Sequence, residues 1–109
     1  MLISSSVAAA TAVTGYDLLR DKPNATISPG QRITRCGLRG SAASGDTLVR
    51  VMAGNSMVAE LYNSATDFPT ETDMMPIEYV HRGPSTRIYA IVADAPATNP
   101  INIVLTRVP

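Results

Sequence analysis

The chain has 109 residues, of which 45% are hydrophobic, and its nine basic side chains balance its nine acidic ones. This length is typical of one domain, and the apolar content predicts a folded core rather than a disordered chain. Because binding to phosphates needs an excess or a stripe of basic residues, a net charge of zero argues against nucleic acid as the main partner. No stretch reaches the ~18 apolar residues that span a bilayer, and the N-terminus lacks the positive region of a signal peptide.

The arginines and the single cysteine indicate how the chain makes contacts and how its fold is held together. Lys22 is the only lysine among the basic residues, and the rest are arginines. The planar, multi-donor guanidinium suits contact surfaces, although a GC-rich genome explains the same bias equally well. The single cysteine, Cys36, excludes an internal disulfide. We therefore expect a fold held by its core and not by cross-links.

The first part of the chain is small and rich in hydroxyl groups. We interpret residues 1–14 as an extended arm or edge strand, and residues 15–109 as a single domain. Residues 16–20 admit a short helical turn, which closes on the turn sequence of residues 21–24. After residue 27, Pro29-Gly30 predicts a tight turn, because proline fixes φ and glycine accepts positive φ.

Three strands are predicted in the middle of the chain. The first covers residues 32–39, and its alternation places Ile33 on the face opposite Cys36 and Leu38. The other two, residues 47–53 and 56–62, are joined by Gly54-Asn55, which is a typical link of a tight hairpin. In the first of these two strands, alternation places Val49 and Val51 on one face. In the second, it places Met57, Ala59 and Leu61 on one face and Val58, Glu60 and Tyr62 on the other.

The last third combines a long polar loop with three further strands. The loop covers residues 63–75, and loops of this length in a small domain are often functional. Residues 76–81 form a predicted strand. Residues 86–93 are the most apolar run and the best candidate for a central strand covered on both faces. Residues 101–108 close the domain, with Ile101, Ile103 and Leu105 on one face.

Together these segments predict seven or eight short strands with no helical crossover. We therefore expect an all-β fold: a single antiparallel β-sandwich, jelly-roll-like, with an extended N-terminal arm. A partly open barrel is the alternative.

The sequence offers little of the chemistry that catalysis or metal binding needs. His81 is the only histidine, and zinc sites and nucleophilic triads need more partners than His81 and Cys36 supply. The acidic loop residues Asp67, Glu71 and Asp73 match no calcium-binding spacing. We therefore expect no catalytic residue, no metal and no cofactor, and rank a hydrolase that uses His81 last.

Three features indicate contact surfaces: the N-terminal arm, the apolar residues of the long loop, and the arginines. A frayed terminus, a loop folded onto its own core and a solvated face are the ordinary alternatives. The interface candidates are Leu2, Ile3, Val7, Phe68, Met74, Met75, Arg82 and Arg87.

In architecture alone, the chain resembles the small jelly-roll or sandwich proteins that build or decorate viral capsids. They share many short strands, abundant Ala, Thr and Ser, no catalytic set and extended terminal arms. The resemblance implies a structural protein of a virus or bacteriophage, as a capsid, cement or spike component located in the virion. Its partners are then copies of itself, in a homo-oligomer or lattice, or other virion proteins. The alternative is a carbohydrate- or receptor-binding sandwich module with its site near residues 63–75.

Overall fold

The computed structural model describes residues 2–8, 11–39, 47–62, 74–94 and 100–109. Within these ranges every element of regular structure is a β-strand, which confirms the predicted all-β class and the expected number of strands. The eight strands are β1 (Leu2–Val7), β2 (Thr26–Ile27), β3 (Arg32–Arg39), β4 (Leu48–Ala53), β5 (Ser56–Tyr62), β6 (Met75–Val80), β7 (Thr86–Asp94) and β8 (Ile101–Val108).

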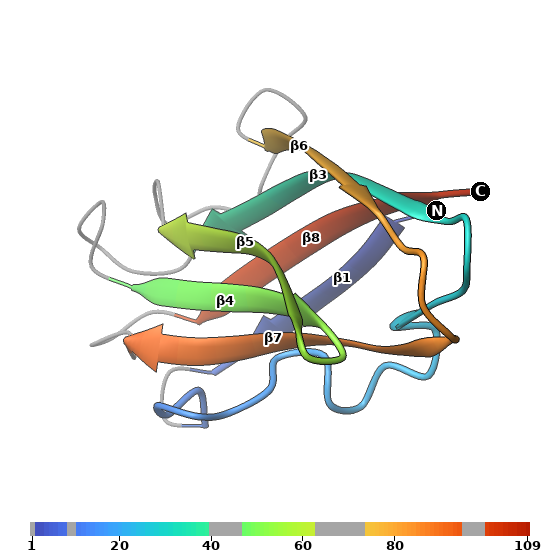
Figure 1. The fold of residues 1–109 in the computed structure, drawn as a ribbon. Helices are drawn as coiled ribbons and strands as arrows, with labels where there is room; N and C mark the ends of the chain where they lie inside the picture. The colour runs from blue at the N-terminus through green and yellow to red at the C-terminus, as the bar shows by residue number, and fades with distance from the viewer. Residues whose placement is uncertain (1, 9–10, 40–46, 63–73, 95–99) are drawn as a thin grey trace.

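The strands form two four-stranded antiparallel sheets with the orders β1-β8-β3-β6 and β2-β7-β4-β5. Figure 1 shows β4, β5 and β7 in front of β1, β3 and β8, so the sheets make two layers, as in a β-sandwich. Each strand of the first half of the chain pairs with one of the second half: β1 with β8, β2 with β7, β3 with β6 and β4 with β5. The outermost strands are therefore β1 and β6 in one sheet and β2 and β5 in the other.

The core lies between the layers and receives one row of apolar side chains from each sheet. Successive residues of a strand point to opposite faces, so alternate positions supply these rows. The largest fully buried side chains are Ile3, Leu19, Ile27, Ile33, Ile88, Ile101, Ile103, Leu105, Val49, Val51 and Val92. The rows predicted for residues 49 and 51 and for residues 101, 103 and 105 are thus confirmed. In the interior strand β7, the outward side chains Tyr89, Ile91 and Ala93 are half-buried.

A bulge in β3 overturns the faces that simple alternation predicts there. Pairing with β8 shifts by one residue between Ile33 and Arg35, so Thr34 is the extra residue. An extra residue reverses the alternation beyond it. Ile33, Cys36 and Leu38 consequently all point into the core, although the sequence pattern places Ile33 on the other face.

A second bulge corrects the prediction for β5. Val51 lies opposite Ala59 while the next residue, Met52, lies opposite Met57, so Val58 is the extra residue. Ala59 and Leu61 are buried as expected, but Met57 is 51% exposed and Val58 packs against the core. The register shift thus exchanges the faces of Met57 and Val58.

The short helical turn predicted for residues 16–20 appears only as a hydrogen-bonded turn, in which Arg20 N–H donates to Asp17 O at 3.2 Å, and no helix develops from it. Asp17 instead forms an isolated antiparallel bridge with Ile91 of β7. Its carboxylate Oδ1 accepts hydrogen bonds from the backbone N–H groups of Leu19, at 3.0 Å, and Ala90, at 2.9 Å. A short acidic side chain that accepts hydrogen bonds from nearby backbone N–H groups competes with helix formation, which explains why no helix forms at these residues.

The bulge in β5 leads to a stability prediction for a neighbouring pair of residues. We expect Met57→Ala to change the free energy of unfolding by at most about 0.5 kcal/mol, because exposed positions contribute little. Val58→Ala should cost about 1 kcal/mol, because it removes two methyl groups packed against the core. Urea denaturation of both variants checks this, and the reverse ranking would show that the strand has no bulge.

Candidate functional site

A pocket opens between the edge strand β1 and the segment of residues 16–22. Its volume is about 300 Å³, and its polar lining includes Ser5 of β1 together with Tyr16, Asp21 and Lys22 of the segment. The two walls of the pocket come from different layers, because β1 belongs to one sheet and residues 16–22 lie along the other. The pocket therefore depends on how that segment is held in place.

Main-chain hydrogen bonds fix the start of this segment along β7. Gly15 N–H donates to Val92 O at 2.7 Å, Val92 N–H donates to Tyr16 O at 3.0 Å, and Leu18 N–H donates to Ala90 O at 2.9 Å. Gly15 has a φ of 91°, in the left-handed region that favours glycine. The segment thus continues the edge of the second sheet beyond the short strand β2.

Arg87 holds the end of the same segment. Its guanidinium donates to the carbonyl oxygens of Leu19, at 2.8 Å, and Lys22, at 3.3 Å. Leu19 itself is fully buried in the core. Arg87 is an interface candidate from the sequence, but its Nη2 group is committed within the chain and fixes the turn that carries Asp21 and Lys22.

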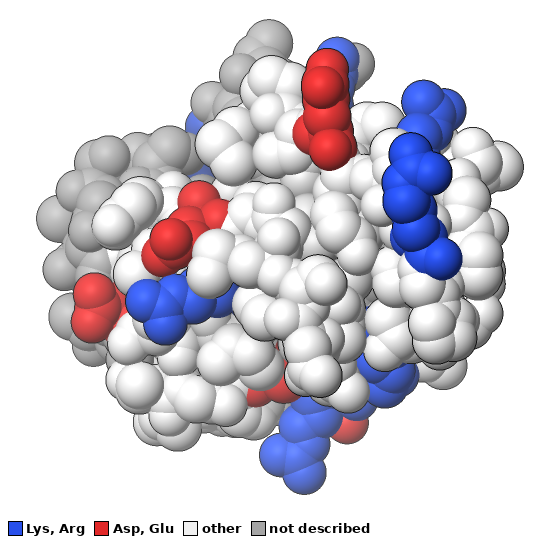
Figure 2. Space-filling model, viewed as in Figure 1, with Lys and Arg blue, Asp and Glu red and all other residues white. Residues whose placement is uncertain are grey.

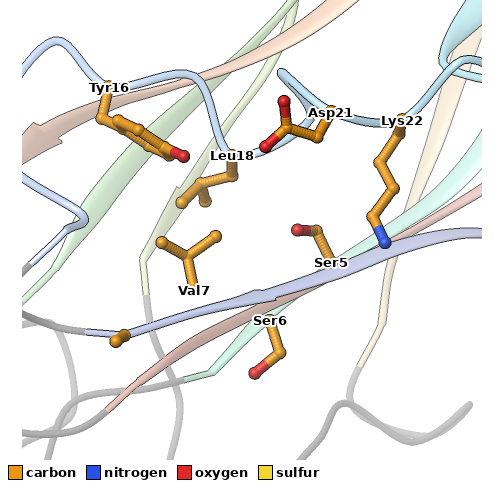
Figure 3. Close-up of a pocket in the computed structure, with 8 residues that line it drawn as sticks. Ser5, Ser6, Val7, Tyr16, Leu18, Asp21 and Lys22 are labelled. Carbon is orange, nitrogen blue, oxygen red and sulfur yellow. The ribbon is translucent and has the colours of Figure 1, made fainter.

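The pocket lining contains groups that can donate and accept hydrogen bonds. In Figure 3 the Ser5 hydroxyl and the Val7 side chain point from β1 toward residues 16–22, whereas Ser6 points away. The Lys22 ammonium reaches back toward β1, and the carboxylate of Asp21 lies at the same side. One acid and one base leave the lining neutral, so it favours a polar, uncharged or zwitterionic group over a simple ion.

The side-chain amine, carboxylate and hydroxyl groups of this pocket have no hydrogen-bond or ion-pair partner within the described ranges. Tyr16 does contact Arg20, whose guanidinium carbon lies 5.9 Å from the ring centroid. Polar groups that face a pocket without a protein partner are bound to water until another molecule replaces it. The arrangement can therefore bind a ligand or a partner.

His81 lies at the corner between β6 and β7, where its ring stabilises the turn of the chain. It is buried, and its Nε2 lies 2.8 Å from Pro84 O. Because a carbonyl oxygen only accepts, Nε2 carries the proton, and Nδ1 accepts from the Tyr79 hydroxyl at 2.9 Å. Both ring nitrogens are thus used to close the corner between β6 and β7.

Neither the single cysteine nor the possible metal ligands form a reactive centre among the described residues. Cys36 is buried in β3, and this burial raises the pKa of its thiol to about 12. A thiol that resists ionisation is a poor nucleophile at neutral pH. In the part of the chain that the structure describes, no three His, Cys, Asp or Glu side chains come close enough to bind a metal ion.

The interface candidates on β1 face different ways. Leu2 is 63% exposed on the outward face, Val7 is half-buried against the core, and Ile3 is fully buried and belongs to the core of its own chain. The side chain of Ile3 is therefore not available to a partner.

The other candidates lie around β6, the opposite edge of the same sheet. Met75 is exposed at its start, Met74 is half-buried just before it, and Arg82 is exposed two residues after its end. Phe68 lies outside the described residues. The structure thus brings the surface candidates to two edges of one sheet instead of gathering them in one patch.

Sequence reasoning missed the pocket because its walls meet only in the folded chain. The sequence pattern predicts a turn at Asp21 and Lys22, and nothing in a single sequence places them beside Ser5. The alternation of β1 was the only available signal, since it puts Ser5 on the same face as the buried Ile3. Serine is mostly exposed in proteins, so a serine in an inward row is the one local feature that sets this position apart.

Comparison with protein-family models, with curated proteins and with solved structures finds no match for this chain. Among the described residues, no helix has the length and apolar character needed to cross a membrane.

The role of Arg87 can be tested by removing its guanidinium. We expect Arg87→Ala to lower the free energy of unfolding by about 1.5 kcal/mol, because hydrogen bonds from charged donors contribute at that level. Trypsin should then cut faster after the exposed Arg20, since the turn loses its attachment. Limited proteolysis followed by mass spectrometry checks this, with Arg82→Ala as the matched control. Equal cleavage rates in both variants would contradict this role of Arg87.

Proposed function

We propose that this chain is a non-enzymatic assembly protein, a capsid, cement or spike component of a virus or bacteriophage that acts through protein–protein contacts. The observation that carries the proposal is the strand order, β1-β8-β3-β6 in one sheet and β2-β7-β4-β5 in the other. A long hairpin whose strands pair in this way, first with last and second with second-last, rolls up into an eight-stranded jelly roll. Jelly rolls build viral capsids, although the same architecture also occurs in lectin domains, so architecture alone does not assign function.

The distribution of exposed apolar side chains supports association. The described large hydrophobic residues with high exposure are Leu2, Val13, Met57, Tyr62, Met75 and Val80. All of them except Val13 lie on the edge strands β1, β5 and β6. Exposed apolar groups that collect at the edges of sheets are placed to be covered when another chain packs against those edges.

The charge distribution is also compatible with close packing of copies. In the face shown in Figure 2, most of the surface is uncharged, and basic side chains gather at its right-hand rim. The net charge is zero, so copies do not repel one another over long distances. A net charge of zero also supports protein partners over nucleic acid, because binding to phosphates is favoured by an excess of basic residues.

The assembly function predicts a molar mass that exceeds that of one chain. We expect light scattering after size exclusion to give a closed oligomer, or a mass that rises with concentration, compared with 11.5 kDa for one chain. Covering the exposed edge residues with a second chain provides the driving force. A mass of one chain across the whole concentration series would contradict self-assembly.

A second candidate function is that of a ligand-binding module, and the pocket beside β1 favours it. Hydroxyl, carboxylate and ammonium groups without protein partners are the side chains that recognise a polyhydroxylated ligand such as a sugar. The candidate site that the structure describes is then the pocket, since most of the loop of residues 63–75, where the sequence places such a site, lies outside the described residues. Tyr79 is less suited than Tyr16, because its hydroxyl is bound to His81.

This alternative predicts binding on a glycan array that depends on the pocket. We expect Asp21→Asn to weaken such binding by about tenfold or more, because a charged hydrogen bond to the ligand is lost. Glu78→Gln, an equivalent change on the exposed face of β6, should leave it unchanged. An array without signal would contradict the ligand-binding function.

A further inference from the structure

The four edge strands of the two sheets differ in how they are protected from pairing with another chain. An edge strand presents unpaired N–H and C=O groups, and proteins limit unwanted pairing with charges, prolines, bulges or very short strands. β6 contains Pro76 and Glu78, β5 contains Glu60 and the bulge at Val58, and β2 has only two residues.

β1 has none of these features. Its six residues, LISSSV, contain no charge and no proline, and its register with β8 is continuous from Leu2↔Thr106 to Val7↔Ile101. Among the described residues, β8 is the only strand that pairs with it. An edge that is long, regular and uncharged is suited to receive another strand.

We propose that β1 pairs in antiparallel fashion with β1 of a second copy of this chain, so that two β1-β8-β3-β6 sheets become one continuous sheet. The inference rests on the proposed assembly function and names the surface that carries it. A two-fold axis between the two strands generates this pairing, as in most symmetric dimers.

The sequence of β1 is complementary to itself across such an axis. A two-fold axis perpendicular to the sheet passes between two copies of the same residue, so inward side chains meet inward ones. With the axis at Ser5, Ile3 lies opposite Val7 of the second copy, and Ser4 lies opposite Ser6 of the second copy. Hydroxyls then meet hydroxyls on the outer face, which is a favourable cross-strand pair, and no charged side chain is opposed on the inner face, where Ile3 stays in the core of its own chain.

The charges next to the edge also allow a second copy to approach. The charged pocket residues beside β1 are Asp21 and Lys22, one acid and one base, so neither copy carries a net charge there that would repel the other. The exposed Leu2 would lose contact with water in the pair. The balanced charge beside β1 and the burial of Leu2 both favour a second copy over a charged partner.

Lysines introduced on the outward face of β1 test this pairing. In the double variant Ser4→Lys/Ser6→Lys, the lysine at position 4 of one copy faces the lysine at position 6 of the other, twice per dimer. Both serines are exposed, so the fold should tolerate the change. We expect the dissociation constant from sedimentation velocity to rise by about tenfold or more, because like charges directly opposite are destabilising.

Two companion samples make the result specific. The variant Asn55→Lys/Ser56→Lys adds the same charge at the exposed β4–β5 hairpin and should assemble like the wild type. Mixing the β1 lysine variant with Ser4→Glu/Ser6→Glu should restore a mixed dimer, because each lysine then faces a glutamate. Loss of assembly in the hairpin variant, or no restoration on mixing, would overturn the proposed pairing.

A cysteine on the proposed axis tests the register directly. Ser5→Cys places two thiols on directly opposite residues, whose Cα atoms are about 4.5–5.5 Å apart and within reach of a disulfide. Mild oxidation should give a covalent dimer, whereas Ser56→Cys at the β5 edge should not. The native Cys36 is buried and adds no background.

The outcomes separate this inference from the proposed function. If the wild type assembles and the β1 lysine variant assembles equally well, the pairing of β1 is wrong and the assembly function stands. If the wild type is a monomer at every concentration but the cysteine variant cross-links, the edge pairs weakly and self-assembly as the function is wrong. If neither occurs, both are overturned.

Discussion

The structure depends on one packing constraint, which is that each strand must turn a row of apolar side chains toward the space between the two sheets. The bulge at Thr34 keeps Ile33 in the same inward row as Cys36 and Leu38. The bulge at Val58 lets β5 continue beside β4 with Ala59 and Leu61 buried. In both strands the chain gives up regular pairing at one residue to keep its apolar groups out of water, because burial of a large side chain is worth about 1.5–3 kcal/mol.

The same constraint explains where the molecule has an opening. β1 turns Ile3, Ser5 and Val7 inward, and the middle one of these is a hydroxyl that contributes nothing to the apolar core. The facing segment of residues 16–22 is attached to β7 by Asp17 and Arg87, so it does not collapse onto Ser5. A pocket with polar walls results beside an edge strand that has no protection against pairing. The pocket and the unprotected edge thus both lie where the core is least complete.

The sequence predicted the features that depend on local pattern, and it failed where contacts between distant residues decide. The strands, the Gly54-Asn55 hairpin and the inward row of β8 follow from alternation and turn residues, and all agree with the structure. The bulges could not be predicted, because an extra residue is recognised only against its partner strand. Nor could the pocket, since Ser5 meets Lys22 through the packing of two sheets. The function of Asp17 was missed because its main acceptor contact is with Ala90, which is 73 residues away.

The two edges of the β1-β8-β3-β6 sheet differ in how well they resist pairing with another chain. This difference decides whether copies would form closed pairs or open chains. If β1 of one copy paired with β6 of the next, the same step would repeat and sheets would extend without limit. β6 disfavours that step, because Pro76 lacks an N–H to donate and Glu78 adds a charge that must lose water. Pairing of β1 with its own copy uses up the unprotected edge of both chains at once. A sheet with one protected and one unprotected edge thus favours a closed two-fold pair over an open chain.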